Sequence, residues 1–219
     1  MSFYETIRNN ETIKTYIRKA DESLAALGFT EHSFAHVTRV SEVAGNILST
    51  LGYSEHVIEN AKIAGYLHDI GNMVNRCAHS QSSGIMVFRL LSDLGMPPED
   101  VADIVSAVGN HDEGTGVAVN PVAAALILAD KSDVRRSRVR NRDKTTFDIH
   151  DRVNYSVEKS TLKISPDNKI ITLRLTVDTK YGSIMDYFEI FMNRMIMCRK
   201  AAESIGLSFK LIINDQPLM

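Results

Sequence analysis

The chain of 219 residues contains no tryptophan and only two cysteines, Cys77 and Cys198. Two distant cysteines form neither a disulfide framework nor the closely spaced pairs of a structural zinc site. No apolar run approaches the roughly 20 residues that a membrane-spanning helix needs. The first residues, "MSFYETIRNN", lack the basic and apolar segments of a secretion signal. These absences predict a cytoplasmic protein that makes no membrane contact.

The net charge is also low, because 25 Lys and Arg residues nearly balance 27 Asp and Glu residues. A formal net charge of -2 argues against general affinity for nucleic acid. The one basic run, "RRSRVRNR", holds Arg135, Arg136, Arg138, Arg140 and Arg142. We interpret most of it as a solvated face balanced by nearby aspartates such as Asp133 and Asp148. It has no accompanying aromatic platform, so we do not expect it to bind nucleic acid.

From residue 1 to about residue 150, apolar residues recur at intervals of three and four, which indicates amphipathic helices. Ser54 and Asn120 are placed as N-caps, Pro121 suits a first helical turn, and Gly95 suits a helix end. The expected helices cover residues 37–51, 54–69, 83–95, 96–111 and 120–134. This pattern predicts a bundle of short helices.

After about Asp151 the period changes to two. Residues 155–164 and 170–178 predict a β-hairpin, residues 183–206 a long amphipathic helix, and residues 207–213 a last strand. The methionines in the helix are expected to fill the core; they are Met185, Met192, Met195 and Met197. The fold class is therefore mainly α, with a small C-terminal α/β (β-β-α-β) appendage. We expect two domains, 1–150 and 151–219.

Several histidines and two aspartates stand near the ends of the expected helices. They are His36, His68, Asp69, His79, His111 and Asp130. A carboxylate at a helix C-terminus is unfavourable for the helix dipole, as for Asp69 and Asp130. A divalent cation would compensate. Imidazole with carboxylate suits iron, manganese, nickel or zinc, and the lack of a cysteine argues against structural zinc.

The order His36, then His68-Asp69, then Asp130 resembles the H…HD…D pattern of the HD superfamily of metal-dependent phosphohydrolases. His79 and His111 match the two additional histidines of its extended form, H…HD…H…H…D. The surrounding segments "HSFAHVTRV", "LHDIGN" and "LADKSD" fit as well. The resemblance covers roughly residues 30 to 135, and it implies a helical domain with a metal site.

By this resemblance, one metal takes His36, His68, Asp69 and Asp130. A second takes His79 and His111, with Asp69 bridging and orienting the hydroxide. Some relatives carry a lysine three residues after the HD pair, where this chain has Asn72. By position, Arg76 and Lys131 are the substitutes that could hold a phosphate. If the helix of Asp130 continued, Lys131, Arg135 and Arg138 would form one stripe.

The resemblance implies a binuclear hydrolase that cleaves a phosphoester or phosphoanhydride through a metal-bound hydroxide. The expected substrate is a nucleotide or another small phosphorylated metabolite. One alternative is a di-iron HD-fold oxygenase, which uses the same ligand set. Another is a metal-bound nucleotide-sensing module, whose strand edges could form a homodimer. The sequence leaves His32 open between a contact that supports a metal ligand, a substrate contact and an exposed residue. It places His56 on the surface and assigns His150 no role.

Overall fold

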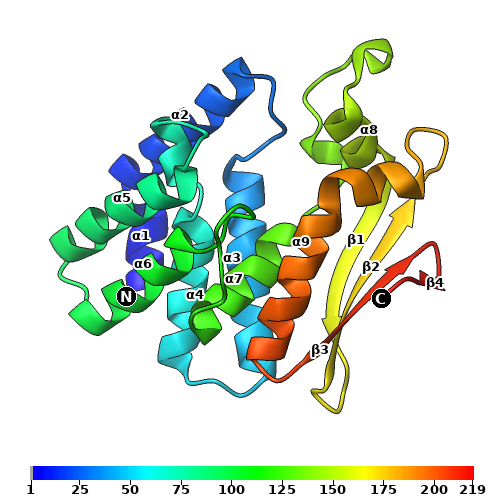
Figure 1. Cartoon of the computed structure of the whole chain (residues 1–219). Helices are drawn as coiled ribbons and strands as arrows, with labels where there is room; N and C mark the ends of the chain where they lie inside the picture. The colour runs from blue at the N-terminus through cyan, green and yellow to red at the C-terminus, as the bar shows by residue number, and fades with distance from the viewer. Residues whose placement is uncertain (1) are drawn as a thin grey trace.

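A computed structural model describes residues 2–219, and its first part is a bundle of helices (Figure 1). The helices are α1 (Phe3–Asn9), α2 (Glu11–Ala26), α3 (Phe34–Thr50), α4 (Glu55–Leu67), α5 (His79–Asp93), α6 (Pro98–Gly109) and α7 (Pro121–Lys131). Short 3-10 turns follow α4 and α7; they are η1 (Ile70–Met73), η2 (Arg136–Arg138) and η3 (Lys144–Thr146). The helical first part that the hydrophobic period predicted is confirmed.

Local signals set several helix ends where the sequence predicted them. The Asn120 side chain accepts a hydrogen bond from the backbone N–H of Ala123 at 2.7 Å, and Pro121 occupies the first position of α7. Ser54 holds the N-cap position of α4. Gly95, just beyond α5, has a φ of 72°, a left-handed conformation that glycine adopts readily. These ends are encoded within a few residues of the chain.

Several helix boundaries differ from the predicted ranges, and two of the differences bear on the candidate site. Helix α5 begins at His79 rather than at Ser83. The prediction missed the first turn, "HSQS", because that turn is polar and carries no apolar period. Helix α7 ends at Lys131, and Arg135 has an extended backbone with φ −162°. The conditional stripe of Lys131, Arg135 and Arg138 along one continuing helix is therefore not formed.

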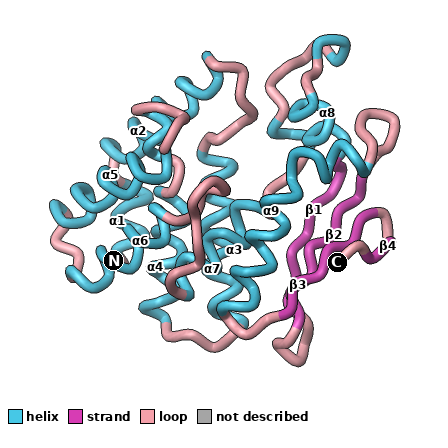
Figure 2. Tube along the Cα trace, viewed as in Figure 1, coloured by secondary structure: helices cyan, strands magenta, loops and turns pink. Residues whose placement is uncertain are grey.

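The C-terminal part is a sheet covered by one long helix (Figure 2). Its elements are α8 (Ile149–Ser156), β1 (Val157–Ile164), β2 (Ile170–Val177), α9 (Ile184–Ser204), β3 (Ser208–Ile213) and β4 (Gln216–Pro217). The strand order is β1-β2-β3-β4, with β2 and β3 parallel and the outer pairs antiparallel. The predicted β-β-α-β order is confirmed, while α8 and the short β4 were not expected. Dimerisation through the strand edges stays a prediction.

Helix α9 lies between the sheet and the helical bundle, beside α7 (Figure 1). One face of β2 is buried beneath it, since Leu173 and Leu175 are at most 1% exposed. Met195 and Met197 are buried as predicted, whereas Met185 is 73% and Met192 41% exposed. The expectation that all the methionines fill the core was wrong for these two, which lie on the solvent side of α9.

One apolar core runs from the helical bundle through α9 into the sheet. Helix α8 crosses the boundary that was placed between residues 150 and 151. Neither observation tests the division into domains 1–150 and 151–219, which stays a prediction. Within residues 2–219, none of the helices is both long and apolar enough to cross a membrane.

Two glycines allow close backbone approach where the candidate ligands meet. A Cβ at Gly71 would lie 2.3 Å from the carbonyl oxygen of His79 and 2.4 Å from the nitrogen of Ser83. A Cβ at Gly65 would lie 2.7 Å from the nitrogen and Cα of Ser41. Backbone atoms cannot rotate away from such a contact. The glycine of "LHDIGN" is thus required by the packing of η1 against α5.

We expect Gly71→Ala to lower the free energy of unfolding by about 1–3 kcal/mol, as overpacked sites do. Gly109→Ala is the control, because a Cβ there meets no atom of residues 2–219 within 4 Å. Chemical denaturation of both variants measures the difference. An equal loss in the two variants would contradict the packing argument.

Candidate metal centre

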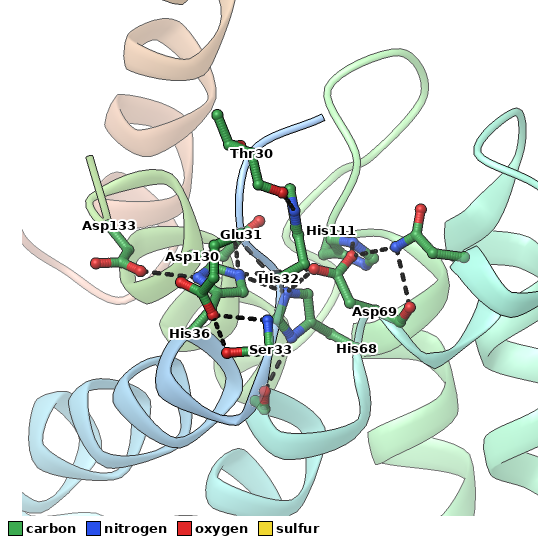
Figure 3. Close-up of polar contacts among 12 residues, drawn as sticks. Thr30, Glu31, His32, Ser33, His36, His68, Asp69, His111, Asp130 and Asp133 are labelled. Carbon is green, nitrogen blue, oxygen red and sulfur yellow. Dashed lines mark hydrogen bonds and ion pairs between the residues drawn. The ribbon is translucent and has the colours of Figure 1, made fainter. Parts of the chain in front are cut away.

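The predicted ligands come from helix ends that meet at one place in the bundle. They are His36 on α3, His68 and Asp69 after α4, His79 at the start of α5, His111 after α6 and Asp130 at the end of α7. All are buried except Asp130, whose side chain is 12% exposed. Figure 3 shows that His36, His68, Asp69, His111 and Asp130 point toward one another from separate segments. The fold therefore gathers residues that are far apart in sequence.

The first group of atoms surrounds His36 and His68. His36 Nε2 lies 3.3 Å from His68 Nε2 and 3.4 Å from Asp130 Oδ1. Asp69 Oδ2 lies 3.6 Å from His36 Nε2 and 3.2 Å from His68 Nε2. Neighbouring ligands of a cation bound at about 2.1 Å are about 3.0–3.4 Å apart. The atoms of His36, His68 and Asp130 all lie within 4.8 Å of one another, a spacing that fits one divalent cation.

The second group surrounds His79 and His111. Their Nε2 atoms are 3.1 Å apart. Asp69 Oδ1 lies 3.5 Å from His79 Nε2 and 3.9 Å from His111 Nε2. The two oxygens of Asp69 thus face different groups, with Oδ2 toward His36 and His68 and Oδ1 toward His79 and His111. Asp69 therefore lies within reach of both groups.

The histidine rings are held so that Nε2 faces the centre. In each ring, Nδ1 faces an oxygen that only accepts, at 2.6 to 3.2 Å; the acceptors are Gly65 O for His68, Arg76 O for His79, Val108 O for His111 and Asp133 Oδ2 for His36. Nδ1 must therefore carry the proton, and in a neutral ring Nε2 presents its lone pair. Lone pairs that face each other in a buried site repel, unless a proton or a cation lies between them.

The two carboxylates stay ionised. Burial alone would raise the pKa of Asp69 and Asp130. Burial is outweighed by the neighbouring groups together, led by His68 for Asp69 and by Lys131 for Asp130, so both pKa values lie well below their usual range. Burial lowers the pKa of His68, but Asp69 raises it more, and the net shift is upward. A proton on His68 can supply positive charge in the absence of a metal, and a metal would displace it.

The second pair of histidines is neutral. Burial lowers the pKa of His111 to about 3, and the charges of His68 and Lys131 act in the same direction. Burial also lowers the pKa of His79, against the opposing effect of Asp69. Neutral imidazole is the form that binds metals. These two rings are therefore ready to act as ligands near neutral pH.

A cavity of about 330 Å³ opens onto this cluster, and Arg76 and Lys131 both line it. Arg76 Nη1 lies 3.3 Å from His79 Nε2. Lys131 is 5% exposed, and its Nζ lies 2.8 Å from Asp130 Oδ2. Burial lowers the pKa of Lys131, but Asp130 and Glu113 outweigh that effect and raise it, so the ammonium stays charged. Both candidate phosphate-binding cations thus reach the cavity.

Asn72, which occupies the position of the relatives' lysine, holds the central carboxylate. Its Nδ2 donates to the carbonyl oxygen and to Oδ1 of Asp69, both at 2.9 Å. Arg76 Nη1 in turn donates to Asn72 Oδ1 at 3.3 Å. The sequence indicated only that a lysine was missing, whereas the structure shows an amide that orients Asp69.

Asp133 is a residue whose role the sequence analysis missed. It was assigned to the balance of the basic run, but it is 2% exposed and accepts the Nδ1 proton of His36 at 2.8 Å. The interpretation of the run as solvated was wrong for Arg138, which is 5% exposed and donates to the carbonyl oxygens of Glu31 and Asp133. The segment "LADKSD" held the signal, because Asp133 lies one turn beyond Asp130.

The remaining histidines lie around the site or on the surface. His32 lines the cavity, and its ring centroid is 5.3 Å from that of His36. This partly buried position argues against an exposed placement of His32. The His56 side chain is 63% exposed and pairs with Asp100, so its surface placement is confirmed. His150, which was given no role, is exposed at the rim of the cavity.

His111 generates a prediction for the metal-free protein. Its pKa is about 3 in the folded chain against 6.5 for a free histidine, so the unfolded state binds the extra proton. Its contribution to stability is complete above pH 6.5 and is lost as the pH falls. Between pH 7 and pH 5 we expect His111→Gln to remove up to about 2 kcal/mol of the pH dependence of unfolding.

Chemical denaturation of chelator-treated protein at pH 7 and at pH 5 measures this change in the free energy of unfolding. Asn110→Gln is the control, because it alters the neighbouring position without changing any titratable side chain. Identical pH profiles for wild type and His111→Gln would contradict the neutral, buried state of His111.

Comparison with known proteins agrees with this geometry. A model of the HD domain matches residues 33–159, which is more than half of the chain. The chain is also similar to the uncharacterized protein MJ1020 of Methanocaldococcus jannaschii, at 23% identity over 203 aligned residues that cover 82% of this chain and 77% of that protein. That relative's name states no activity. The chain belongs to the HD domain family, a superfamily of metal-dependent phosphohydrolase type whose members bind divalent metals.

Proposed function

We propose that this HD protein is a metal-dependent phosphohydrolase that cleaves a phosphoester or phosphoanhydride of a nucleotide or another small phosphorylated metabolite. One observation carries the proposal. The two oxygens of Asp69 face two separate groups of ligand atoms, and Asp69, Arg76 and Lys131 all line the same cavity. Paired cations beside fixed positive side chains are the arrangement that phosphoryl transfer requires.

In this proposal the chain supplies two sets of ligands that share one carboxylate. One set is His36, His68, Asp130 and Asp69 Oδ2; the other is His79, His111 and Asp69 Oδ1. Divalent cations such as iron, manganese, nickel or zinc would provide an activated water and neutralise charge on the phosphoryl oxygens. Asn72 orients Asp69, and Asp133 orients the ring of His36. Arg76 and Lys131 would hold phosphate oxygens.

The cavity favours a small substrate. Its volume of about 330 Å³ lies near the lower end of the range for small-molecule pockets, about 300–1,000 Å³. Phe29 lines the cavity and is 41% exposed, so it offers an aromatic face on which a planar base could stack. These features support a mononucleotide or a similar metabolite over a polymer.

Metal content tests the two-site arrangement. In protein purified without added metal, we expect two ions per chain by mass spectrometry, falling to one in His79→Ala. His56→Ala is the control, because its side chain is exposed and lies on α4 away from the ligand cluster. One ion per chain in both wild type and His79→Ala would remove His79 from the metal site and leave the simpler H…HD…D set.

Phosphate release tests the reaction. A panel of nucleotides and small phosphomonoesters, assayed with manganese, iron or nickel, should yield inorganic phosphate. Asp69→Asn should lower the rate at least about 100-fold, because loss of one carboxylate charge weakens both metal sets. Dioxygen-dependent loss of substrate without phosphate release would favour the oxygenase instead. Tight nucleotide binding with no turnover of any compound would favour the sensing module.

A further inference from the structure

Helix α9 forms one wall of the metal cavity, although it lies outside the matched HD residues 33–159. Phe191 and Arg194, one turn apart on α9, both line the cavity, as do His111 and Lys131 of the HD part. Figure 1 shows α9 running beside α7, which carries Asp130 and Lys131. The C-terminal part therefore contributes side chains to the space where a substrate would sit.

Arg194 is held in place by its neighbours. The guanidinium carbon lies 4.4 Å from the centroid of the Phe191 ring, a cation–π contact that helps to hold the group in place. Arg194 Nε lies 2.5 Å from Glu113 Oε1, an ion pair between α9 and the loop after α6. Within residues 2–219 this buried nitrogen makes no hydrogen bond, so its contact with Glu113 is an ion pair alone. The guanidinium is thus charged, oriented and incompletely satisfied.

Glu113 connects Arg194 to the cation beside the metal ligands. The same oxygen, Oε1, lies 3.4 Å from Lys131 Nζ. One carboxylate oxygen therefore stands between the guanidinium of α9 and the ammonium of α7. The buried Arg138 adds a third positive charge to the cavity wall.

We propose that Arg194 is a substrate-binding residue that holds a phosphate of the substrate together with Lys131, and that Glu113 occupies this anion site until a phosphate displaces it. The inference rests on the proposed function, because it assigns the phosphate that the metal site would act on. A phosphate carries more charge than one carboxylate and offers oxygens to both cations at once. Its arrival would give the Arg194 guanidinium a hydrogen-bonded partner in place of the Glu113 ion pair, and Glu113 would turn toward solvent, where 26% of its side chain is already exposed.

Under this assignment, α9 has a role in the site in addition to its packing between the helical part and the sheet. A cavity closed only by the HD helices would lack Arg194 and its Phe191 support. With α9 in place, cations from two parts of the chain face one anion. Specificity for phosphate, rather than for a neutral substrate, then depends on a residue outside the matched HD segment.

Binding of inorganic phosphate to manganese-loaded protein, measured by titration calorimetry, tests the proposal. Arg194→Met should weaken phosphate binding about 10- to 100-fold, the effect of losing a charge-assisted hydrogen bond. Arg194→Lys keeps the charge but lacks the planar guanidinium, so its affinity for phosphate should lie between those of Arg194→Met and wild type. Glu113→Gln should tighten binding by about threefold or more, because it removes the competing anion. A purely structural role for this ion pair would weaken binding in both Arg194→Met and Glu113→Gln.

Arg199→Met is the matched control, since Arg199 lies on the same helix with 47% of its side chain exposed. Circular dichroism and metal content establish that each variant is folded and loaded. Any substrate that is hydrolysed should show a raised KM and a nearly unchanged kcat in Arg194→Met. Unchanged phosphate affinity in Arg194→Met, or no phosphate binding by wild type, overturns the proposal even if the protein hydrolyses phosphoesters. Arg194-dependent phosphate binding without any turnover supports it and counts against the proposed hydrolysis.

Discussion

Imidazole lone pairs and carboxylate oxygens are buried close together, and they repel one another unless a positive charge lies between them. The rest of the structure depends on how this repulsion is relieved. Asp69 and Asp130 stand at helix C-termini, where the helix dipole disfavours a negative charge. The Nε2 atoms of His36 and His68 face each other at 3.3 Å, and those of His79 and His111 at 3.1 Å. Burial makes every unpaired group costly. Positive charge at the centre relieves the repulsion, and divalent cations provide it in the HD family.

The surrounding structure keeps the ligands in this unfavourable arrangement. Backbone carbonyls and Asp133 fix the Nδ1 protons, so the rings cannot turn their lone pairs away. Asn72 holds the Asp69 carboxylate by its amide. Gly71 lets η1 press against the start of α5, which positions His79. The ligands come from the ends of α3, α4, α5, α6 and α7. A shift of any of these helices moves a ligand, so the packing of the helices sets the geometry of the site.

The C-terminal part is bound to the same centre by two kinds of contact. Its apolar residues continue the core, with Phe191 and Met195 at most 1% exposed on α9. Its charged residues reach the cavity, where Arg194 meets Glu113. A helix that packs on both the sheet and α7 can hold a long, charged side chain at a fixed place. This combination allows an appendage outside the matched HD segment to shape what the cavity accepts.

The sequence alone determined the helical period, the strand alternation after residue 151, caps such as Asn120 and the order of the six candidate ligands. These features are local, because hydrogen bonds and apolar faces repeat within a few residues. Tertiary structure decided that α5 starts at His79, that Asp133 supports His36, and that Arg194 enters the cavity. None of these has a local pattern: α5 opens with a polar turn, and Arg194 is one of several charged residues on an amphipathic helix. Their roles arise from packing between segments far apart in the chain, which no short stretch of sequence encodes.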